Sequence, residues 1–222
     1  MAGYGARDVR VYLLDDHDLV RRGMRDLVAA APDIEVVGDS ASAGTAALDI
    51  VRRRVDVALL DLQLQDGSGV AVARRLRAAE PSIKVLLLTA ASPDDALVAT
   101  VLAGADGYLL KVAPPSDIVG AIRRLATGRT VLDPAAVARG RALVEERRRT
   151  VRPPPSDREV VLVDLLVAGA SDAAIAARLA ATEESLAGAI EKVVDRIVFG
   201  GRSPSAMTET PPPAVGKHRR ED

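Results

Sequence analysis

The feature that most constrains the fold is an alternation, between residues 9 and 127, of short apolar runs with longer stretches of helical periodicity. The runs are rich in Val, Leu and Ile, which is typical of strands buried on both faces of a parallel sheet. They cover Val9–Leu14, Ile34–Val37, Val55–Leu60, Ile83–Leu88 and Tyr108–Leu110. The sequence therefore predicts an open, doubly wound α/β domain of five strand–helix units, which binds ligands at the carboxyl ends of its strands.

The helices between these runs are predicted at residues 17–30, 42–53, 70–79, 94–103 and 115–127. In the third of them the apolar residues recur at helical spacing and are expected to face the core. Its three arginines, Arg74, Arg75 and Arg77, are then expected to point outward.

The segment from 134 to 152 differs from the preceding residues because it is rich in arginine and has no apolar strand-like run. Pro134 is suited to the first turn of a helix, which is predicted to continue to Arg149. The segment carries six arginines against two glutamates, and we interpret the run 147–149 as a solvated face, with phosphate binding as the alternative. The triple proline at 153–155 ends the helix and predicts a stiff spacer.

Residues 156 to about 200 predict a small all-α domain. Ser156 and Glu159 have the spacing of a capping box, and Ser171 and Thr182 are expected to cap two further helices. Two short helices followed by a longer one indicate helix-turn-helix architecture. From Gly200 onward the chain is rich in Gly, Ser and Pro, so a disordered tail is expected over 204–222.

The composition excludes several classes of function. The chain has no cysteine, which removes disulfide scaffolds, thiolate metal sites and cysteine nucleophiles. Its two histidines, His17 and His218, are far apart in the sequence. No apolar stretch is long enough to span a bilayer, and residues 1–8 lack the apolar centre of a signal peptide. We therefore expect a cytoplasmic protein with no membrane partner.

Polar residues follow four of the predicted strands. Asp15 and Asp16 follow the first strand and Asp61 the third. Three carboxylates at one sheet edge repel one another unless a divalent cation binds between them, and hard oxygen ligands suit Mg²⁺. Thr89 ends the fourth strand and Lys111 follows the fifth, so a hydroxyl and an ammonium join the acids. This set suits phosphoryl transfer onto a carboxylate.

The single histidine beside these acids has two interpretations. His17 comes directly after Asp16, where a general base is conceivable. The simpler interpretation is that His17 occupies the first turn of the following helix.

With these positions identified, residues 9–127 resemble the flavodoxin-like (βα)5 receiver domain of bacterial two-component response regulators. The resemblance is carried by Leu-Asp-Asp-His at 14–17, Leu-Asp-Leu-Gln-Leu-Gln-Asp-Gly at 60–67, Leu-Thr-Ala at 88–90 and Gly-Tyr-Leu-Leu-Lys at 107–111. One departure is Gln65, where the family often has proline.

The resemblance implies a role for each matching residue. Asp61 would accept phosphate from a sensor histidine kinase. Mg²⁺ would be held by Asp15, Asp16, Asp61 and the backbone carbonyl of Gln63. Thr89 and Lys111 would contact the phosphoryl group, and Tyr108 would rotate as the domain switches.

Residues 156–203 resemble the LuxR-type helix-turn-helix domain, most recognisably in Gly-Ala-Ser-Asp-Ala-Ala-Ile-Ala-Ala-Arg-Leu at 169–179. The chain is then similar to LuxR-type response regulators throughout. Its parts would be an extension at 1–8, a receiver at 9–127, a linker at 128–155, an output domain at 156–203 and a tail at 204–222. The resemblance implies a homodimer that binds DNA.

The output domain departs from its family in charge. Ala187 stands where the third helix usually carries a lysine, and residues 153–205 hold five basic and eight acidic side chains, a net charge of −3. A DNA-binding domain normally presents a basic face. The remaining candidates for phosphate contacts are Lys192, Arg196 and Arg202.

Three hypotheses follow. The first is a phosphorylation-controlled transcription regulator that binds DNA. The alternative is a phosphorylation-dependent switch whose output domain acts through protein contacts. The third, a phosphatase with an aspartate nucleophile, needs an acid–base carboxylate two residues beyond Asp61, where Gln63 stands. We therefore expect that the protein is not an enzyme.

Overall fold

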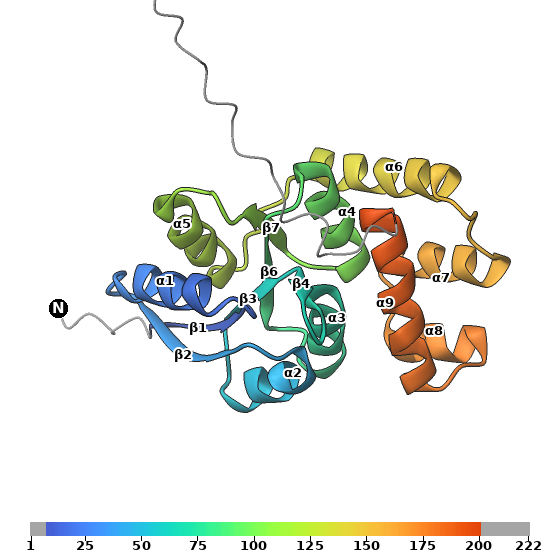
Figure 1. Ribbon diagram of the computed structural model, residues 1–222. Helices are drawn as coiled ribbons and strands as arrows, with labels where there is room; N and C mark the ends of the chain where they lie inside the picture. The colour runs from blue at the N-terminus through green and yellow to red at the C-terminus, as the bar shows by residue number, and fades with distance from the viewer. Residues whose placement is uncertain (1–7, 201–222) are drawn as a thin grey trace, which may run out of the picture.

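The computed structural model describes residues 8–200, and its N-terminal half confirms the predicted α/β fold (Figure 1). A parallel five-stranded sheet has the order β2-β1-β3-β6-β7. Its strands are β1 (Val9–Leu14), β2 (Ile34–Ser40), β3 (Val57–Asp61), β6 (Lys84–Thr89) and β7 (Gly107–Leu110). The helices between them are α1 (Asp18–Ala29), α2 (Ala43–Arg52), α3 (Gly69–Ala79), α4 (Pro93–Ala103) and α5 (Pro115–Ala126).

The sheet separates two hydrophobic cores. Successive residues of a strand face opposite sides, so Val11 and Leu13 pack with α1 and α5, whereas Tyr12 and Leu14 pack with α2, α3 and α4. All four side chains are almost completely buried. This arrangement explains why the strand sequences are apolar throughout.

Two local features differ from the expectation. The helix α1 begins at Asp18, so His17 is its N-cap residue and not part of its first turn. A small antiparallel pair, β4 (Gln63–Leu64) and β5 (Gly67–Ser68), follows β3. Two-residue strands leave no periodicity in the sequence, so this turn was not predicted.

The C-terminal half is helical. Its elements are α6 (Pro134–Thr150), α7 (Asp157–Val167), α8 (Asp172–Leu179) and α9 (Glu183–Phe199). The three expected caps are present: Ser156, Ser171 and Thr182 each accept a hydrogen bond from a backbone N–H of the following helix. Ser156 and Glu159 form a complete capping box. No helix within residues 8–200 is long and apolar enough to cross a membrane.

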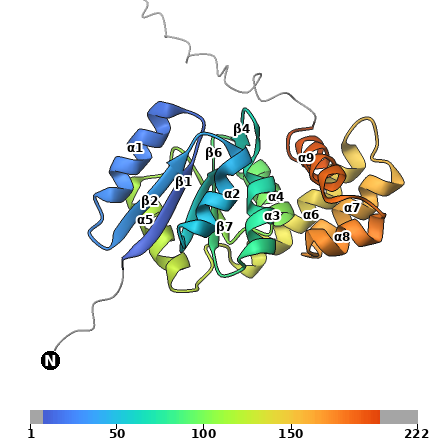
Figure 2. The ribbon, with the colours of Figure 1, turned by 90° about the horizontal axis from the view of Figure 1, so that it is seen from below.

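The C-terminal helices dock directly onto the N-terminal half (Figure 2). Helix α4 contacts α6, α7 and α9, and α3 contacts α9. One hydrophobic cluster runs without interruption from the sheet through Val98 and Leu102 of α4 to Val194 and Val198 of α9. Although Pro153 and Pro154 are exposed in the turn after α6, they do not hold the two halves apart.

Two expectations about arginines are wrong for this reason. Arg74 was expected to point outward, but only 6% of it is exposed. The run 147–149 was expected to be solvated, and Arg149 is exposed, but Arg147 forms an ion pair with Asp95 of α4 at 2.7 Å and donates to the carbonyl of Val198 in α9. Both arginines lie at the interface at which the C-terminal helices cover α3 and α4 of the N-terminal domain.

Candidate functional site

The predicted polar residues gather at the carboxyl edge of the sheet. Because β1, β3, β6 and β7 are parallel neighbours in the sheet, they all end on this edge. Asp15 follows β1, Asp61 is the last residue of β3, Thr89 is the last of β6 and Lys111 follows β7. The parallel sheet therefore brings together residues that lie up to about a hundred positions apart in the chain.

Lys111 bridges two of the carboxylates. Its Nζ lies 2.6 Å from Asp15 Oδ2 and 2.7 Å from Asp61 Oδ2. The side chains of both aspartates are more than nine-tenths buried, and Lys111 is only slightly more exposed. A buried carboxylate pair of this kind is tolerated because the ammonium compensates its charge.

The site shifts the ionisation of its groups. Burial raises the pKa of the Asp61 carboxyl to about 6, opposed by the charge and hydrogen bond of Lys111 and assisted by the charge of Asp15. Burial lowers the pKa of Lys111, but the charge of Asp61 and the hydrogen bonds to both aspartates outweigh it, so the pKa lies above its usual value. Lys111 therefore stays cationic at neutral pH.

Asp16 and His17 complete the cluster. Asp16 Oδ2 accepts the backbone N–H of Gln65 at 3.0 Å. Asp16 Oδ1 is buried and has no hydrogen-bond partner among the described residues, although His17 Nδ1 lies 2.7 Å from it. One ligand atom from each of Asp15, Asp16, His17 and Asp61 lies within 4.8 Å of the others. This donor set fits a divalent cation.

The backbone after Asp61 is held close to the strand end. The N–H of Gln63 points to Asp61 Oδ1 over a long 3.4 Å. A Cβ on Gly69 would lie 2.2 Å from the carbonyl oxygen of Asp61, so only glycine permits α3 to begin here. The loop that carries the candidate ligand Gln63 is therefore held close to Asp61 both at its start, by Gln63, and at its end, by Gly69.

The two other predicted switch residues lie further along the same edge. Thr89 is 1% exposed, and its Oγ1 accepts the backbone N–H of Ala91 at 2.9 Å. Tyr108 is half-buried in β7, opposite Leu87, and packs against the core that continues into the C-terminal helices.

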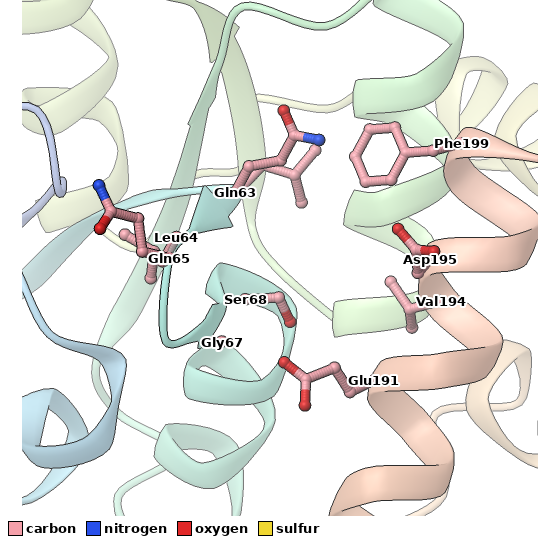
Figure 3. Close-up of a pocket in the computed structure, with 10 residues that line it drawn as sticks. Gln63, Leu64, Gln65, Gly67, Ser68, Glu191, Val194, Asp195 and Phe199 are labelled. Atoms are coloured by element: carbon pink, nitrogen blue, oxygen red, sulfur yellow. The ribbon is translucent and has the colours of Figure 1, made fainter. Parts of the chain in front are cut away.

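A pocket that no sequence pattern predicts lies between the loop after Asp61 and α9. It measures about 470 Å³, and the amide of Gln63 is turned toward the ring of Phe199 across it (Figure 3). The carboxylates of Glu191 and Asp195 also line it, and burial raises the pKa of Asp195. Since more than 120 positions separate the two walls, only the tertiary structure reveals this pocket.

The candidate DNA contacts have different surroundings. Lys192 is exposed on α9. Arg196 forms an ion pair with Glu159 of α7 and donates to the carbonyl of Pro153 at 2.5 Å. Arg202 lies outside the described residues, as does the predicted tail. Of the two candidates within residues 8–200, Lys192 is therefore exposed to solvent, whereas Arg196 is held between α7 and the carbonyl of Pro153.

Comparisons with known proteins agree with this geometry. Residues 11–123 match the family model of the response regulator receiver domain. The chain is 32% identical over 207 residues to the DNA-binding transcriptional activator DevR/DosR of Mycobacterium tuberculosis (strain ATCC 25618 / H37Rv), covering 91% of this chain and 94% of that protein.

Two solved structures are similar as well. The signal receiver domain of the putative response regulator NarL from Mycobacterium tuberculosis has 33% identity and a TM-score of 0.53, covering 56% of this chain and all of that one. The response regulator ChrA of a heme-sensing two-component system has 28% identity and a TM-score of 0.50, covering 88% of this chain and 97% of that one.

Proposed function

Because the chain belongs to the two-component response regulators, with a receiver domain in its N-terminal half, we propose that phosphorylation of Asp61 by a sensor histidine kinase controls transcription through DNA binding by residues 156–203. The observation that supports this most strongly is the pairing of Asp61 and Asp15 through Lys111 at the carboxyl edge of the sheet. The protein would act in the cytoplasm, as a homodimer and without an enzymatic activity of its own.

The residues of the site divide the work of phosphoryl transfer. A carboxylate oxygen of Asp61 forms the bond to phosphorus while the bond to the histidine nitrogen of the kinase breaks. Lys111 already contacts Asp61 and neutralises charge on the transferred group. Thr89 supplies the hydroxyl that bonds a phosphoryl oxygen once its hydrogen bond with Ala91 is given up.

A Mg²⁺ ion fits this site, because the carboxylates of Asp15, Asp16 and Asp61 gather there and Asp16 Oδ1 is buried without a hydrogen bond from any residue in the range 8–200. Asp15, Asp16 and Asp61 would hold it together with the backbone carbonyl of Gln63. When bound, the cation supplies positive charge to the phosphoryl oxygens.

The docked arrangement gives phosphorylation a route to the output domain. Helix α9, the third helix of the output domain, packs against α3 and α4 and lines the pocket beside Gln63. DNA binding through α9 therefore requires its separation from the receiver. A phosphate on Asp61 adds charge and acceptor oxygens next to the loop that lines the pocket with α9. It thereby shifts the equilibrium between docked and separated α9 toward the separated state.

The alternative output, contact with other proteins, is favoured by the charge of α9. Glu191 and Asp195 stand on this helix, and Ala187 offers no cation to DNA. Phosphorylation would then expose a surface for a protein partner.

One experiment separates the two outputs. The full-length protein is mixed with sheared genomic DNA at two salt concentrations, with and without beryllofluoride as a phosphoryl mimic, and the retained DNA is sequenced. Enrichment of a defined sequence that depends on the mimic supports transcription control, and binding should weaken steeply with salt because counterions are released. If no DNA is retained at low salt while the mimic still changes the receiver, DNA is not the output.

A further inference from the structure

The pocket between the β4–β5 turn and α9 combines apolar side chains with acidic ones. Leu62, Val194 and Phe199 line it and are almost completely buried. The carboxylates of Glu191 and Asp195, one helical turn apart on α9, line it as well and reach solvent (Figure 3). Its volume of about 470 Å³ is that of a ligand pocket, so the space is large enough for several side chains.

The two carboxylates have no compensating charge. Neither Glu191 nor Asp195 forms an ion pair with another residue in the range 8–200. Burial alone raises the pKa of the Asp195 carboxyl. Because like charges at positions i and i+4 of a helix repel each other, a cationic occupant of the pocket would stabilise α9.

The amide of Gln63 is a second, independent observation. Its Nε2 is buried without a hydrogen-bond partner among residues 8–200, and the amide is turned into the pocket toward Phe199 (Figure 3). A buried donor without a partner is unfavourable, and a carbonyl oxygen of an occupant would accept its hydrogen bond. The pocket therefore offers a donor, apolar contacts and two carboxylates, which together suit a peptide segment with apolar and basic residues.

The chain itself contains such a segment outside the described residues. The sequence Ala-Val-Gly-Lys-His-Arg-Arg at 214–220 places an apolar pair beside three cationic side chains, which are Lys217, Arg219 and Arg220. Its charge is opposite to that of Glu191 and Asp195, and its apolar pair matches the buried lining of the pocket.

The segment is attached next to the pocket. Helix α9 ends at Phe199, which lines the pocket, and Lys217 is 17 positions after Gly200. An extended chain of that length spans up to about 55 Å. Glu191 lies only about 12 Å along the helix from Phe199. The segment therefore reaches both carboxylates, and a tethered segment meets its site at a far higher effective concentration than a separate peptide does.

We propose that residues 214–220 occupy this pocket of the same molecule, with their cationic side chains at Glu191 and Asp195. A backbone carbonyl of the segment accepts the free N–H of the Gln63 amide. Because one wall of the pocket belongs to the receiver loop and the other to α9, the segment contacts both and stabilises the docked arrangement. This contact depends neither on phosphorylation of Asp61 nor on DNA binding.

The chain suits a test by spin labelling because it has no cysteine. In the full-length protein, Asp222→Cys carries a nitroxide just beyond the basic residues, and the amide signals of ¹⁵N-labelled protein are compared before and after reduction of the label. We expect residues 63–68 and 191–199 to lose signal intensity, and α5 on the other face of the sheet to keep it. The loss should diminish at high salt because charges at the protein surface are screened.

Variants of the two charged partners test the pairing. Glu191→Gln should restore most of the lost intensity. Glu184→Gln removes an exposed charge of the same helix outside the pocket and should leave the loss unchanged. Lys217→Glu together with Arg219→Glu should abolish the loss, and adding Glu191→Lys to this pair should bring part of it back. A variant that only misfolds would not be rescued in this way.

Three outcomes overturn the inference. The first is full signal intensity at residues 63–68 and 191–199. The second is an equal effect of Glu191→Gln and Glu184→Gln, because the segment then responds only to net charge. The third is the same loss in a mixture of ¹⁵N-labelled protein without nitroxide and unlabelled protein with it, because the occupant then comes from a second copy. The proposed function survives each of them, since phosphate uptake and DNA selection test it separately.

Discussion

Arg74 of α3 reaches out of the receiver domain and ends 2.6 Å from Asp172, the first residue of α8. The same guanidinium donates to the carbonyl of Ala170 at 2.7 Å and to that of Leu102 at 3.3 Å. It therefore joins the receiver to the output domain and to the end of α4 in one buried contact. Neither domain by itself would bury this charge.

Replacement of Arg74 by alanine should loosen the contact between the domains. The change leaves two carbonyls and the carboxylate of Asp172 without a partner, which costs about 2–4 kcal/mol of unfolding free energy. Hydrogen exchange should show faster exchange of α8 and α9 amides, with the sheet unchanged. The matched control is Arg75→Ala, since Arg75 is exposed on the same helix and should change stability by no more than about 0.5 kcal/mol. Equal effects of the two variants would contradict the role of Arg74.

Gly140 permits α6 to approach α4. A Cβ there would lie 2.6 Å from Val101 Cγ2 and 3.1 Å from Leu97 Cγ. Gly140→Ala should therefore cost about 1–3 kcal/mol through overpacking, in spite of the better helix propensity of alanine. In α5, a Cβ on Gly120 meets nothing within 4 Å, so Gly120→Ala should stabilise by up to about 1 kcal/mol. Urea unfolding measures both, and stabilisation by both variants would show that the approach is not tight.

Asp61→Asn should abolish phosphate uptake and keep the fold. The amide has nearly the shape of the carboxylate, and Lys111 retains its partner Asp15. Labelling with a small phosphodonor measures the uptake, and circular dichroism checks the fold. Asp66→Asn provides a control outside the cluster and should be labelled normally. Normal labelling of Asp61→Asn would rule out Asp61 as the acceptor.

The raised pKa of Asp61 predicts a pH dependence of stability without bound metal. Between about pH 4 and pH 6 the folded protein holds a proton on Asp61 that the unfolded chain releases, so this group's contribution falls as the pH rises through that window. Asp61→Asn lacks this titration. In the presence of a chelator, the variant should match the wild type near pH 4 and exceed its unfolding free energy by up to about 3 kcal/mol at pH 7. A difference that does not vary with pH would contradict the shift.

Lys192 should contribute to DNA affinity as a single phosphate contact. Lys192→Gln should weaken binding about equally for different sequences and reduce the slope of log K against log salt by about 1. Fluorescence anisotropy with the DNA selected above measures the slope. Arg22→Gln, an exposed charge on α1, should leave the slope unchanged. If both variants shift the slope equally, only the net charge matters.

The sequence predicted the elements and the site well where local rules apply. Strands buried on both faces are apolar throughout, and a parallel sheet places all its carboxyl ends on one edge. These two rules were enough to expect Asp15, Asp61 and Lys111 together, and the structure has them in contact. The short β4–β5 pair was not predicted, because a strand of two residues is too short to show an alternating pattern.

What the sequence by itself determined is therefore the fold of each half and the residues at the strand ends, since both follow from periodicity and topology. Only the tertiary structure decided which outward-facing residues become buried. Helical spacing shows which side of α3 faces its own sheet, and Arg74 does lie on the side away from the sheet, but it is buried there by α8 and not solvated. The outer side of α3 contacts α8, and this contact joins segments that lie nearly a hundred residues apart in the sequence. Shape and charge across such an interface are properties of two surfaces together, and no local pattern records them.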